Sequence, residues 1–178
     1  MVTWATTTNQ TTTSTSSVKN TSATGYTNNR SITSNNASSG EVSFEADGFF
    51  DGDSSAYPAV FGLDDGTTTN GQVDYGFGGI GSADEITIIE GSTSVTTTTA
   101  SIADIFKVVL NYSTGEAKYY KNGTLLTTTT GHTFPSTVYG FTTAYYNGDG
   151  IKDVVMVTAA PSGSGSPGLP PPPIVVRF

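Results

Sequence analysis

From Glu41 onward, short stretches of the chain alternate between apolar and polar residues. The apolar positions of EVSFEAD (41–47) are Val42 and Phe44, and Ala59 to Leu63 form a continuous apolar run. Similar stretches are QVDYGFGGIG (72–81), EITIIEGS (85–92), IFKVVLNYSTGEAKYYKNGTLLTTT (105–129) and VYGFTTAYYNGDGIKDVVMVT (138–158). Period-two runs separated by Gly, Asn and Ser are typical of antiparallel sandwiches and barrels. We expect no helix, and residues 101–109 are expected to form a strand because they are rich in β-branched residues.

The stretch YYKNGTLL predicts a tight hairpin. Asn122 and Gly123 separate two strand-forming runs, and this pair suits a type I′ turn, in which both central residues have positive φ. Because side chains alternate along a strand, one of Tyr119 and Tyr120 is expected to face the core and the other the solvent. The turn therefore predicts a scaffold element with little room for a ligand.

The two ends of the sequence differ from its middle. Residues 1–40 are polar and of low complexity, with Val2 and Trp4 spaced as in a half-buried strand. After Thr158, a Gly/Ser linker leads to four prolines and an apolar end, and consecutive prolines favour an extended, semi-rigid helix. We divide the chain into a domain of residues 1–158 and an arm of residues 159–178. The arm either docks on its own domain or reaches a neighbouring subunit, and we predict the latter. Its predicted partner-binding residues are Pro170, Pro171, Pro172, Pro173, Ile174, Val175, Val176 and Phe178.

Composition and charge narrow the function classes. Apolar residues make up 35% of the 178 residues, enough for a core, whereas charged residues make up 12% and the net charge is −8. The seven basic residues form no stripe, which argues against nucleic acid as a partner. Without cysteine, neither disulfides nor thiol chemistry are available. The start, MVTWATTTNQ, does not match a signal peptide, and no stretch is long and apolar enough for a membrane span.

The motifs EVSFEAD, AVFGLDDG, VDYGF, EITIIEGS, IFKVVLNYSTGEAKYYKNGTLL and AYYNGDGIKDVVM, in this order, resemble the concanavalin A-like lectin/glucanase jelly rolls, especially small bacterial and phage structural versions. The resemblance spans residues 1 to 158. It implies an all-β fold, a two-sheet antiparallel β-sandwich, to which the Pro-rich C-terminal arm is added. Such domains occur as sugar-binding modules, as glycosidases and as structural parts of phage particles, so the fold alone does not determine the function.

Catalysis is not expected. The glucanases that the chain resembles carry two glutamates around an aspartate, but EITIIE has Thr87 at the central position. Glu85 and Glu90 are five residues apart, so they point to opposite faces of a regular strand, whereas retaining hydrolysis needs carboxyl groups about 5 Å apart. We therefore expect the two glutamates to be solvated strand ends. His132 is expected to be a surface loop residue, because no nucleophile motif accompanies it.

Two kinds of binding site are weighed. Calcium prefers oxygen ligands such as Asp51 with Asp53, Asp64 with Asp65, and Asn147 with Asp149, but none completes a calcium loop and such clusters are ordinary in turns, so no metal or cofactor is expected. Sugar binding needs exposed aromatic rings beside Asp or Asn. The candidate residues for a sugar site are Tyr57, Tyr75, Tyr145, Tyr146 and Asn147.

The first functional prediction is a non-enzymatic structural protein of a virus particle, a bacteriophage capsid decoration, cement or fibre component on the virion surface. Its partners would be other virion proteins or copies of itself, bound through the arm. The alternative is a carbohydrate-binding module of a secreted or tail-fibre adhesin, which would be extracellular and bind glycans. Neither prediction involves nucleic acid or a membrane.

Overall fold

The computed structural model describes residues 4–8, 10–14, 17–21, 30–50, 59–68, 72–78, 85–144 and 148–159. Every regular element in these ranges is a strand, and neighbouring strands are antiparallel, which confirms the predicted all-β sandwich. These ranges contain no helix long and apolar enough to cross a membrane.

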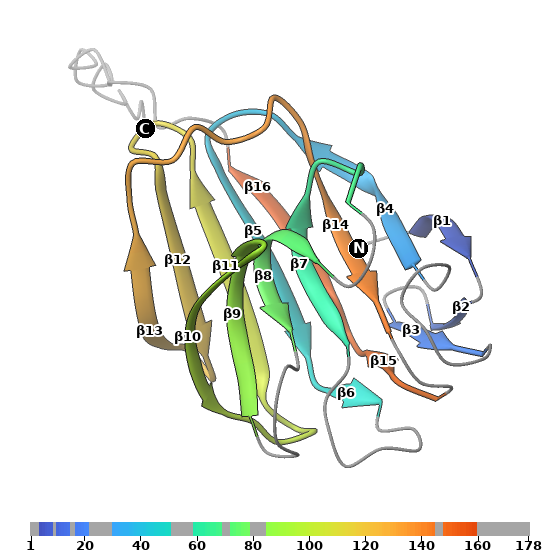
Figure 1. Cartoon of the computed structure of the whole chain (residues 1–178). Helices are drawn as coiled ribbons and strands as arrows, with labels where there is room; N and C mark the ends of the chain where they lie inside the picture. The colour runs from blue at the N-terminus through green and yellow to red at the C-terminus, as the bar shows by residue number, and fades with distance from the viewer. Residues whose placement is uncertain are drawn as a thin grey trace, which may run out of the picture.

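The sandwich is formed by a seven-stranded and a five-stranded sheet (Figure 1). The larger sheet has the order β1 (Trp4–Thr8), β4 (Arg30–Ala37), β14 (Val138–Thr143), β7 (Val60–Asp64), β8 (Val73–Gly78), β9 (Glu85–Gly91), β10 (Thr93–Thr99). The smaller has the order β13 (Thr124–Thr129), β12 (Glu116–Lys121), β11 (Ile105–Asn111), β5 (Glu41–Asp47), β16 (Val155–Ala159).

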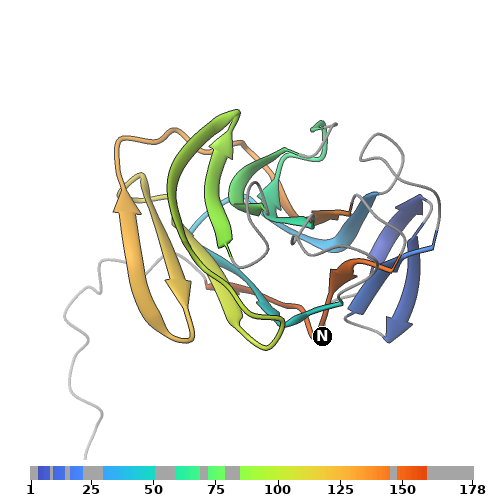
Figure 2. The ribbon, with the colours of Figure 1, turned by 60° about the horizontal axis from the view of Figure 1, so that its bottom comes forward.

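A third, four-stranded sheet lies beside the sandwich, on the side away from β12 and β13 (Figures 1 and 2). Its order is β2 (Gln10–Ser14), β3 (Ser17–Asn20), β15 (Gly150–Ile151), β6 (Phe49–Phe50). This sheet therefore joins two strands from the polar start of the chain, β2 and β3, to β6 and β15, which come much later in the sequence. Trp4, in the neighbouring strand β1, is half-buried against the main core, as its spacing predicted.

Aromatic side chains fill the space between the two large sheets. Phe77 on β8 packs against Phe106 of the opposite sheet at a ring-centroid distance of 5.1 Å and edge-on against Tyr119 at 5.7 Å. Phe61 on β7 stacks on Phe77 at 5.6 Å. All four residues are fully buried, and burial of apolar surface on this scale is the main source of a sandwich's stability.

The Asn122–Gly123 hairpin forms as predicted. Its two central residues have φ of 49° and 76°, the signs that a type I′ turn requires. Tyr119 is fully buried, whereas Tyr120 lies on the outer face of the five-stranded sheet, so the tyrosines do face opposite sides. Asn122 ties the turn to β11, because its Oδ1 accepts a hydrogen bond of 2.8 Å from the Ile105 amide.

One strand boundary differs from the prediction. The strand expected over residues 101–109 begins at Ile105, because Ser101 to Asp104 form a turn closed by the Ser101 amide on Asp104 Oδ2 at 2.8 Å. The last strand ends at Ala159, beside the predicted division between domain and arm. Residues 160–178, and with them all the predicted partner-binding residues from Pro170 to Phe178, lie outside the described residues.

Candidate functional site

Acidic side chains gather at the end of the sandwich drawn at the top of Figure 1, where β7 ends and β8 begins. Leu63 pairs with Tyr75 in the antiparallel register, so the next residue of β7 and the preceding residue of β8 adjoin. Glycines let these strands approach closely, since a Cβ at Gly62 would strike the backbone of Tyr75 and Gly76. The register thus brings Asp64 and Asp74 together although they are ten positions apart.

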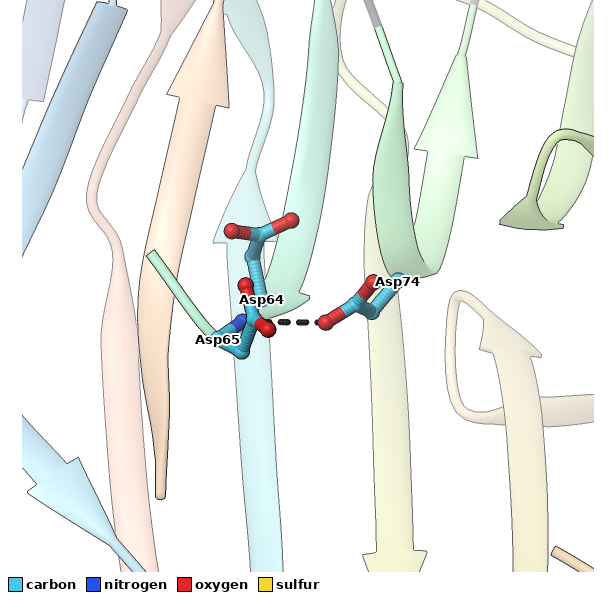
Figure 3. A group of neighbouring side chains, drawn as sticks. All are labelled: Asp64, Asp65 and Asp74. Carbon is cyan, nitrogen blue, oxygen red and sulfur yellow. Dashed lines mark hydrogen bonds between the residues drawn. The ribbon is translucent and has the colours of Figure 1, made fainter. Parts of the chain in front are cut away.

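Asp65 completes a cluster of three carboxylates with Asp64 and Asp74 (Figure 3). One carboxylate oxygen from each residue lies within 4.8 Å of the other two. The Asp65 amide donates a 3.0 Å hydrogen bond to Asp74 Oδ2, the dashed line in Figure 3, which fixes the β7–β8 connection against β8. Within the described ranges, no lysine or arginine forms an ion pair with any of the three.

Asp64 is the least solvated member of the cluster. Its side chain is fully buried, its Oδ1 accepts a 2.7 Å hydrogen bond from the Gly66 amide, and its Oδ2 is buried without a hydrogen-bond partner. Burial raises the pKa of Asp64, and the nearby Asp65 charge raises it further, although interactions with Thr68 and Gly66 act in the opposite direction. A buried carboxylate oxygen that accepts no hydrogen bond is costly unless a cation or a proton meets it.

The pKa of Asp74 is raised, like that of Asp64. Burial, and then the charge of Asp64, raise the pKa of Asp74 to about 6, although the hydrogen bond from the Asp65 amide opposes them. Near neutral pH the cluster therefore holds carboxylates that repel one another. Raised pKa values of this kind concentrate at functional sites, which makes the cluster a candidate for one.

The spacing of the three carboxylate oxygens is compatible with a shared Ca²⁺ ion. Oxygen atoms bound to one Ca²⁺ at about 2.3–2.6 Å lie at most roughly 5 Å apart, whereas Mg²⁺ at about 2.1 Å limits them to roughly 4.2 Å. The 4.8 Å spread falls within the calcium limit. A cation held by Asp64, Asp65 and Asp74 would reduce the mutual repulsion of their carboxylates.

A polar hollow of about 440 Å³ opens next to this cluster, and Asp74 belongs to both. The hollow is lined by the start of β8, the β9–β10 turn and the loop between β13 and β14; its other residues are Tyr75, Glu90, Gly91, Thr93, His132, Thr133 and Pro135. It therefore presents two carboxylates, a phenol, an imidazole and two threonines toward one space.

A network of polar contacts holds Glu90 in the wall of the hollow. Its Oε1 accepts hydrogen bonds from the Tyr119 hydroxyl at 2.8 Å and from Thr129 Oγ1 at 2.5 Å. His132 Nε2 lies 3.7 Å from Glu90 Oε2 and 2.8 Å from Thr129 Oγ1. Burial, followed by the Glu90 charge, raises the pKa of Tyr119, so its hydroxyl keeps its proton and acts as a donor. Tyr75 is in the same wall, where burial and then the Glu90 charge raise its pKa to about 12.

Two expectations about this region are wrong. Glu90 is not a solvated strand end, because β9 turns it inward, on the face that carries Ile86 and Ile88, and toward Tyr119. His132 is not a plain surface residue, because its ring stacks on Phe134 at 5.6 Å and meets the edge of Tyr75 at 5.3 Å. The loop is turned inward to close the end of the core, which sequence spacing alone does not reveal.

Other residues lie where strand geometry predicts, or outside the described ranges. Glu85 is exposed, on the face of β9 opposite to Glu90, so the two glutamates diverge as expected. Of the predicted sugar-binding residues, Tyr75 lines the hollow, whereas Tyr57, Tyr145, Tyr146 and Asn147 lie outside the described residues. The same holds for Asp51 and Asp53, while Asp149 is buried and is not part of the cluster.

Sequence reasoning missed Asp74, although the signal was present. AVFGLDDG and VDYGF read as two strands joined by a polar turn, and pairing them as a hairpin places the aspartates at the end of the first strand and the start of the second side by side. In the observed register Gly62 pairs with Gly76, a cross-strand contact that the sequence alone does not specify.

No protein-family model matches the sequence, and no curated protein sequence matches it significantly. Solved structures match the fold. The TRIM65 PSpry domain has a TM-score of 0.61 at 10% identity, covering 89% of this chain and 90% of its own. The exoplasmic/lumenal domain of VIP36, solved in a Ca²⁺/Man3GlcNAc-bound form, has a TM-score of 0.61 at 8% identity, covering 90% and 86%. Alginate lyase AlgAT5 of polysaccharide lyase family 7 has a TM-score of 0.52 at 14% identity, covering 82% and 80%. At such identities the similarity shows the fold, which is the concanavalin A-like jelly roll.

Proposed function

Since the chain is a concanavalin A-like jelly roll, we propose that it is a non-enzymatic, lectin-like domain that binds neutral glycans in the hollow between β8, β9 and the β13–β14 loop. A calcium ion held by the neighbouring carboxylate cluster would assist this binding. The observation that carries the proposal is the position of Asp74, which lines the hollow and is also one of the three cluster residues.

The groups around the hollow suit sugar hydroxyls. Asp74 and Glu90 supply charged acceptors, which form stronger hydrogen bonds than neutral ones. Thr93 and Thr133 can donate or accept, and Tyr75 offers both a hydroxyl and a ring. An apolar pocket with few polar groups would suit a lipid or a drug-like molecule, whereas a hollow lined mainly by polar groups suits a hydroxyl-rich ligand.

Charge sets the class of glycan. The chain has a net charge of −8, and the hollow carries two carboxylates beside a third and a fourth in the cluster. A sulfated, sialylated or uronate-rich glycan would be repelled by this field. We therefore propose uncharged oligosaccharides as ligands.

A calcium ion would act by preparing the site. Bound to Asp64, Asp65 and Asp74, it would neutralise part of their charge and fix the β7–β8 connection beside the hollow. The VIP36 domain, which shares the fold, was solved with Ca²⁺ and Man3GlcNAc, and this supports testing the two ligands together. The ion could contact a sugar directly or hold Asp74 in place for it.

A glycan array that carries neutral and acidic oligosaccharides tests the proposal. We expect saturable, Ca²⁺-dependent binding to neutral glycans, and loss of at least about tenfold in affinity for Asp74→Asn and Tyr75→Phe, since each removes one charge-assisted or hydroxyl hydrogen bond. Tyr120→Phe is the matched control, because Tyr120 lies on the outer face of the other sheet. Binding to acidic glycans alone, or binding that both site variants retain, would refute the proposal.

A structural role in a virus particle is the second proposal. It is supported by residues 159–178 of the sequence and by Val155 and Val157, exposed hydrophobic residues directly before them. The domain would lie on the virion surface while the arm contacts a neighbouring subunit. Deletion of residues 161–178 should then abolish incorporation into particles and leave the domain folded. Normal incorporation of the shortened chain would exclude this role for the arm.

A further inference from the structure

The carboxylate of Glu90, in the wall of the polar hollow, has two oxygens in different surroundings. Oε1 already accepts two hydrogen bonds, from the Tyr119 hydroxyl at 2.8 Å and from Thr129 Oγ1 at 2.5 Å. Oε2 accepts none from the described residues, since His132 Nε2 at 3.7 Å lies beyond hydrogen-bond distance, and it is not fully buried, unlike Oδ2 of Asp64. One oxygen of Glu90 therefore stabilises the fold, and the other is left for a ligand.

The protons available in this network determine the direction of its hydrogen bonds. Thr129 has one hydroxyl proton, and the short contact with the Glu90 carboxylate takes it, because charge-assisted hydrogen bonds are the shorter and stronger ones. Thr129 Oγ1 is then the acceptor in its 2.8 Å contact with His132, so Nε2 of the ring carries a proton. The other ring nitrogen, Nδ1, has no hydrogen-bond partner among the described residues and is an acceptor in the neutral ring.

Further contacts hold the two side chains in place before any ligand binds. The His132 ring stacks on Phe134 and meets the edge of Tyr75, and the His132 amide donates a 3.1 Å hydrogen bond to the Gly115 carbonyl. The side chains of Glu90 and His132 are only 16% and 19% exposed. Polar groups that are already ordered lose little conformational freedom on binding, which favours affinity.

We propose that Glu90 Oε2 selects the glycan by accepting a hydrogen bond from one free hydroxyl of the sugar. Tyr119 and Thr129 are positioning residues, since they hold the carboxylate with Oε2 toward the hollow, and His132 Nδ1 is the second acceptor. This inference rests on the proposed function, because it names the groups of the hollow that recognise a neutral glycan. A sugar that lacks the hydroxyl leaves a charged acceptor unpaired, and a site built in this way rejects such an analogue.

A double-mutant cycle measured by calorimetry tests the positioning role. The probe is the neutral oligosaccharide that the unaltered chain binds most tightly on the glycan array. We expect Glu90→Gln and Tyr119→Phe each to lower its affinity about tenfold, because the first removes the charge of the acceptor and the second removes a donor that holds it. In the Glu90→Gln background, Tyr119→Phe should cost less than about twofold more, since it acts through the carboxylate.

Thr129→Val and Thr129→Ser form a matched pair of variants. Valine keeps the branched shape without the hydroxyl, so the affinity for the oligosaccharide should fall about fivefold, whereas serine keeps the hydroxyl and should restore the affinity to within about twofold. The Ca²⁺ affinity should be unchanged in all these variants, because none of the substituted residues belongs to the carboxylate cluster. Rescue by serine separates a positioning role from a general loss of packing.

The proton arrangement is measurable without a glycan, because His132 is the only histidine of the chain. Nitrogen-15 NMR at about pH 9, where histidine side chains are neutral, should show nearly all of the ring with its proton on Nε2. In Thr129→Val the form with the proton on Nδ1 should appear beside it, since the acceptor that fixes the first form is lost.

The outcomes distinguish this inference from the proposed function. If no neutral oligosaccharide binds the unaltered chain, the proposed function fails, and the inference fails with it. If an oligosaccharide binds but Glu90→Gln leaves its affinity unchanged, if the losses from Glu90→Gln and Tyr119→Phe add, or if the His132 ring carries its proton on Nδ1, the inference alone is overturned.

Discussion

The aspartates at the two ends of the sandwich have pKa values shifted in opposite directions. At the Asn122–Gly123 end, Asp104 accepts hydrogen bonds from the Ser101 amide and the Asn122 amide group, each at 2.8 Å, and pairs with Lys121 at 3.0 Å. Burial alone would raise the pKa of Asp104, but the hydrogen bonds from Asn122 and Lys121 outweigh it and lower the pKa. At the other end, the pKa values of Asp64 and Asp74 are both raised, and no described lysine or arginine compensates them.

This difference separates a scaffold from a candidate site. Where both carboxylate oxygens accept a hydrogen bond and a lysine pairs with the group, as at Asp104, the charges stabilise the fold and no oxygen is left for a ligand. Where one buried oxygen has no partner and neighbouring carboxylates repel, the free protein is less stable than it could be, and a bound cation would offset this cost. Proteins keep such conflicts at functional positions.

The strongest test of this difference is to remove one carboxylate at each end and measure Ca²⁺ binding by calorimetry. We expect Asp64→Asn to lose at least about a hundredfold in Ca²⁺ affinity, because it removes a full charge and an oxygen ligand in a buried position. The amide oxygen of the new side chain can still accept the hydrogen bond from Gly66, so the local turn should persist.

Asp104→Asn is the matched control for this measurement. It should leave the Ca²⁺ affinity unchanged while it lowers the free energy of unfolding by about 1–2 kcal/mol, since Lys121 loses its ion pair and keeps only its hydrogen bonds to Thr99. Equal Ca²⁺ binding by Asp64→Asn and the unaltered chain, or loss in both variants, would remove the distinction between the two ends.

Substitutions at the Asn122–Gly123 end should lower the free energy of unfolding and leave the Ca²⁺ affinity unchanged. Asn122→Ala removes the hydrogen bonds to Ile105 and Asp104 and leaves a non-glycine residue at positive φ, so we expect a loss of about 2 kcal/mol in urea unfolding. Gly123→Ala isolates the backbone part: a Cβ at this position meets no other atom within 4 Å, yet φ is 76°, so about 1 kcal/mol should be lost. A change in Ca²⁺ affinity in either variant would contradict the proposed division.

The scaffold end could be predicted from the sequence because its signals are local. An Asn–Gly pair between two alternating runs determines the turn, its φ angles and the opposite directions of Tyr119 and Tyr120. The divergence of Glu85 and Glu90 could likewise be predicted, since it follows from the two-residue period of a strand.

The candidate site could be predicted only in part, because it is assembled from distant positions. Tyr75 was singled out as an aromatic residue, but its neighbours Glu90 and His132 come from a different strand and a loop. Glu90 is held inward by hydrogen bonds from Tyr119 and Thr129, which are contacts across 29 and 39 positions of the chain. His132 is held by its ring contacts with Tyr75 and Phe134. Composition and periodicity do not contain this information.

A pH series sharpens the comparison further. A cation competes with protons for Asp74, whose pKa is about 6, so the apparent Ca²⁺ affinity should be constant above pH 7 and fall about tenfold per pH unit below pH 6. Calorimetric titration with CaCl₂ between pH 5 and 8, a range that brackets the pKa of Asp74, measures how the Ca²⁺ affinity changes with pH. Affinity that stays constant down to pH 5 would show that Asp74 is not a ligand.

The smallest expected effect concerns the stability of the free protein. The pKa of Asp74 is about 6 in the folded chain against an ordinary value of 3.8, so the folded state binds more protons than the unfolded state between these values, and this group's contribution to stability falls as the pH rises from about 4 to about 6. Asp74→Asn removes the charge, so above pH 6 and without Ca²⁺ the variant should be more stable than the unaltered chain by at most about 1 kcal/mol, the half-exposed position reducing the effect. Urea unfolding at pH 4, where Asp74 is protonated in the folded chain, provides the internal control, and there the difference should disappear. A variant that is less stable at pH 7 would mean that Asp74 stabilises the fold, as Asp104 does, and the two ends would no longer differ.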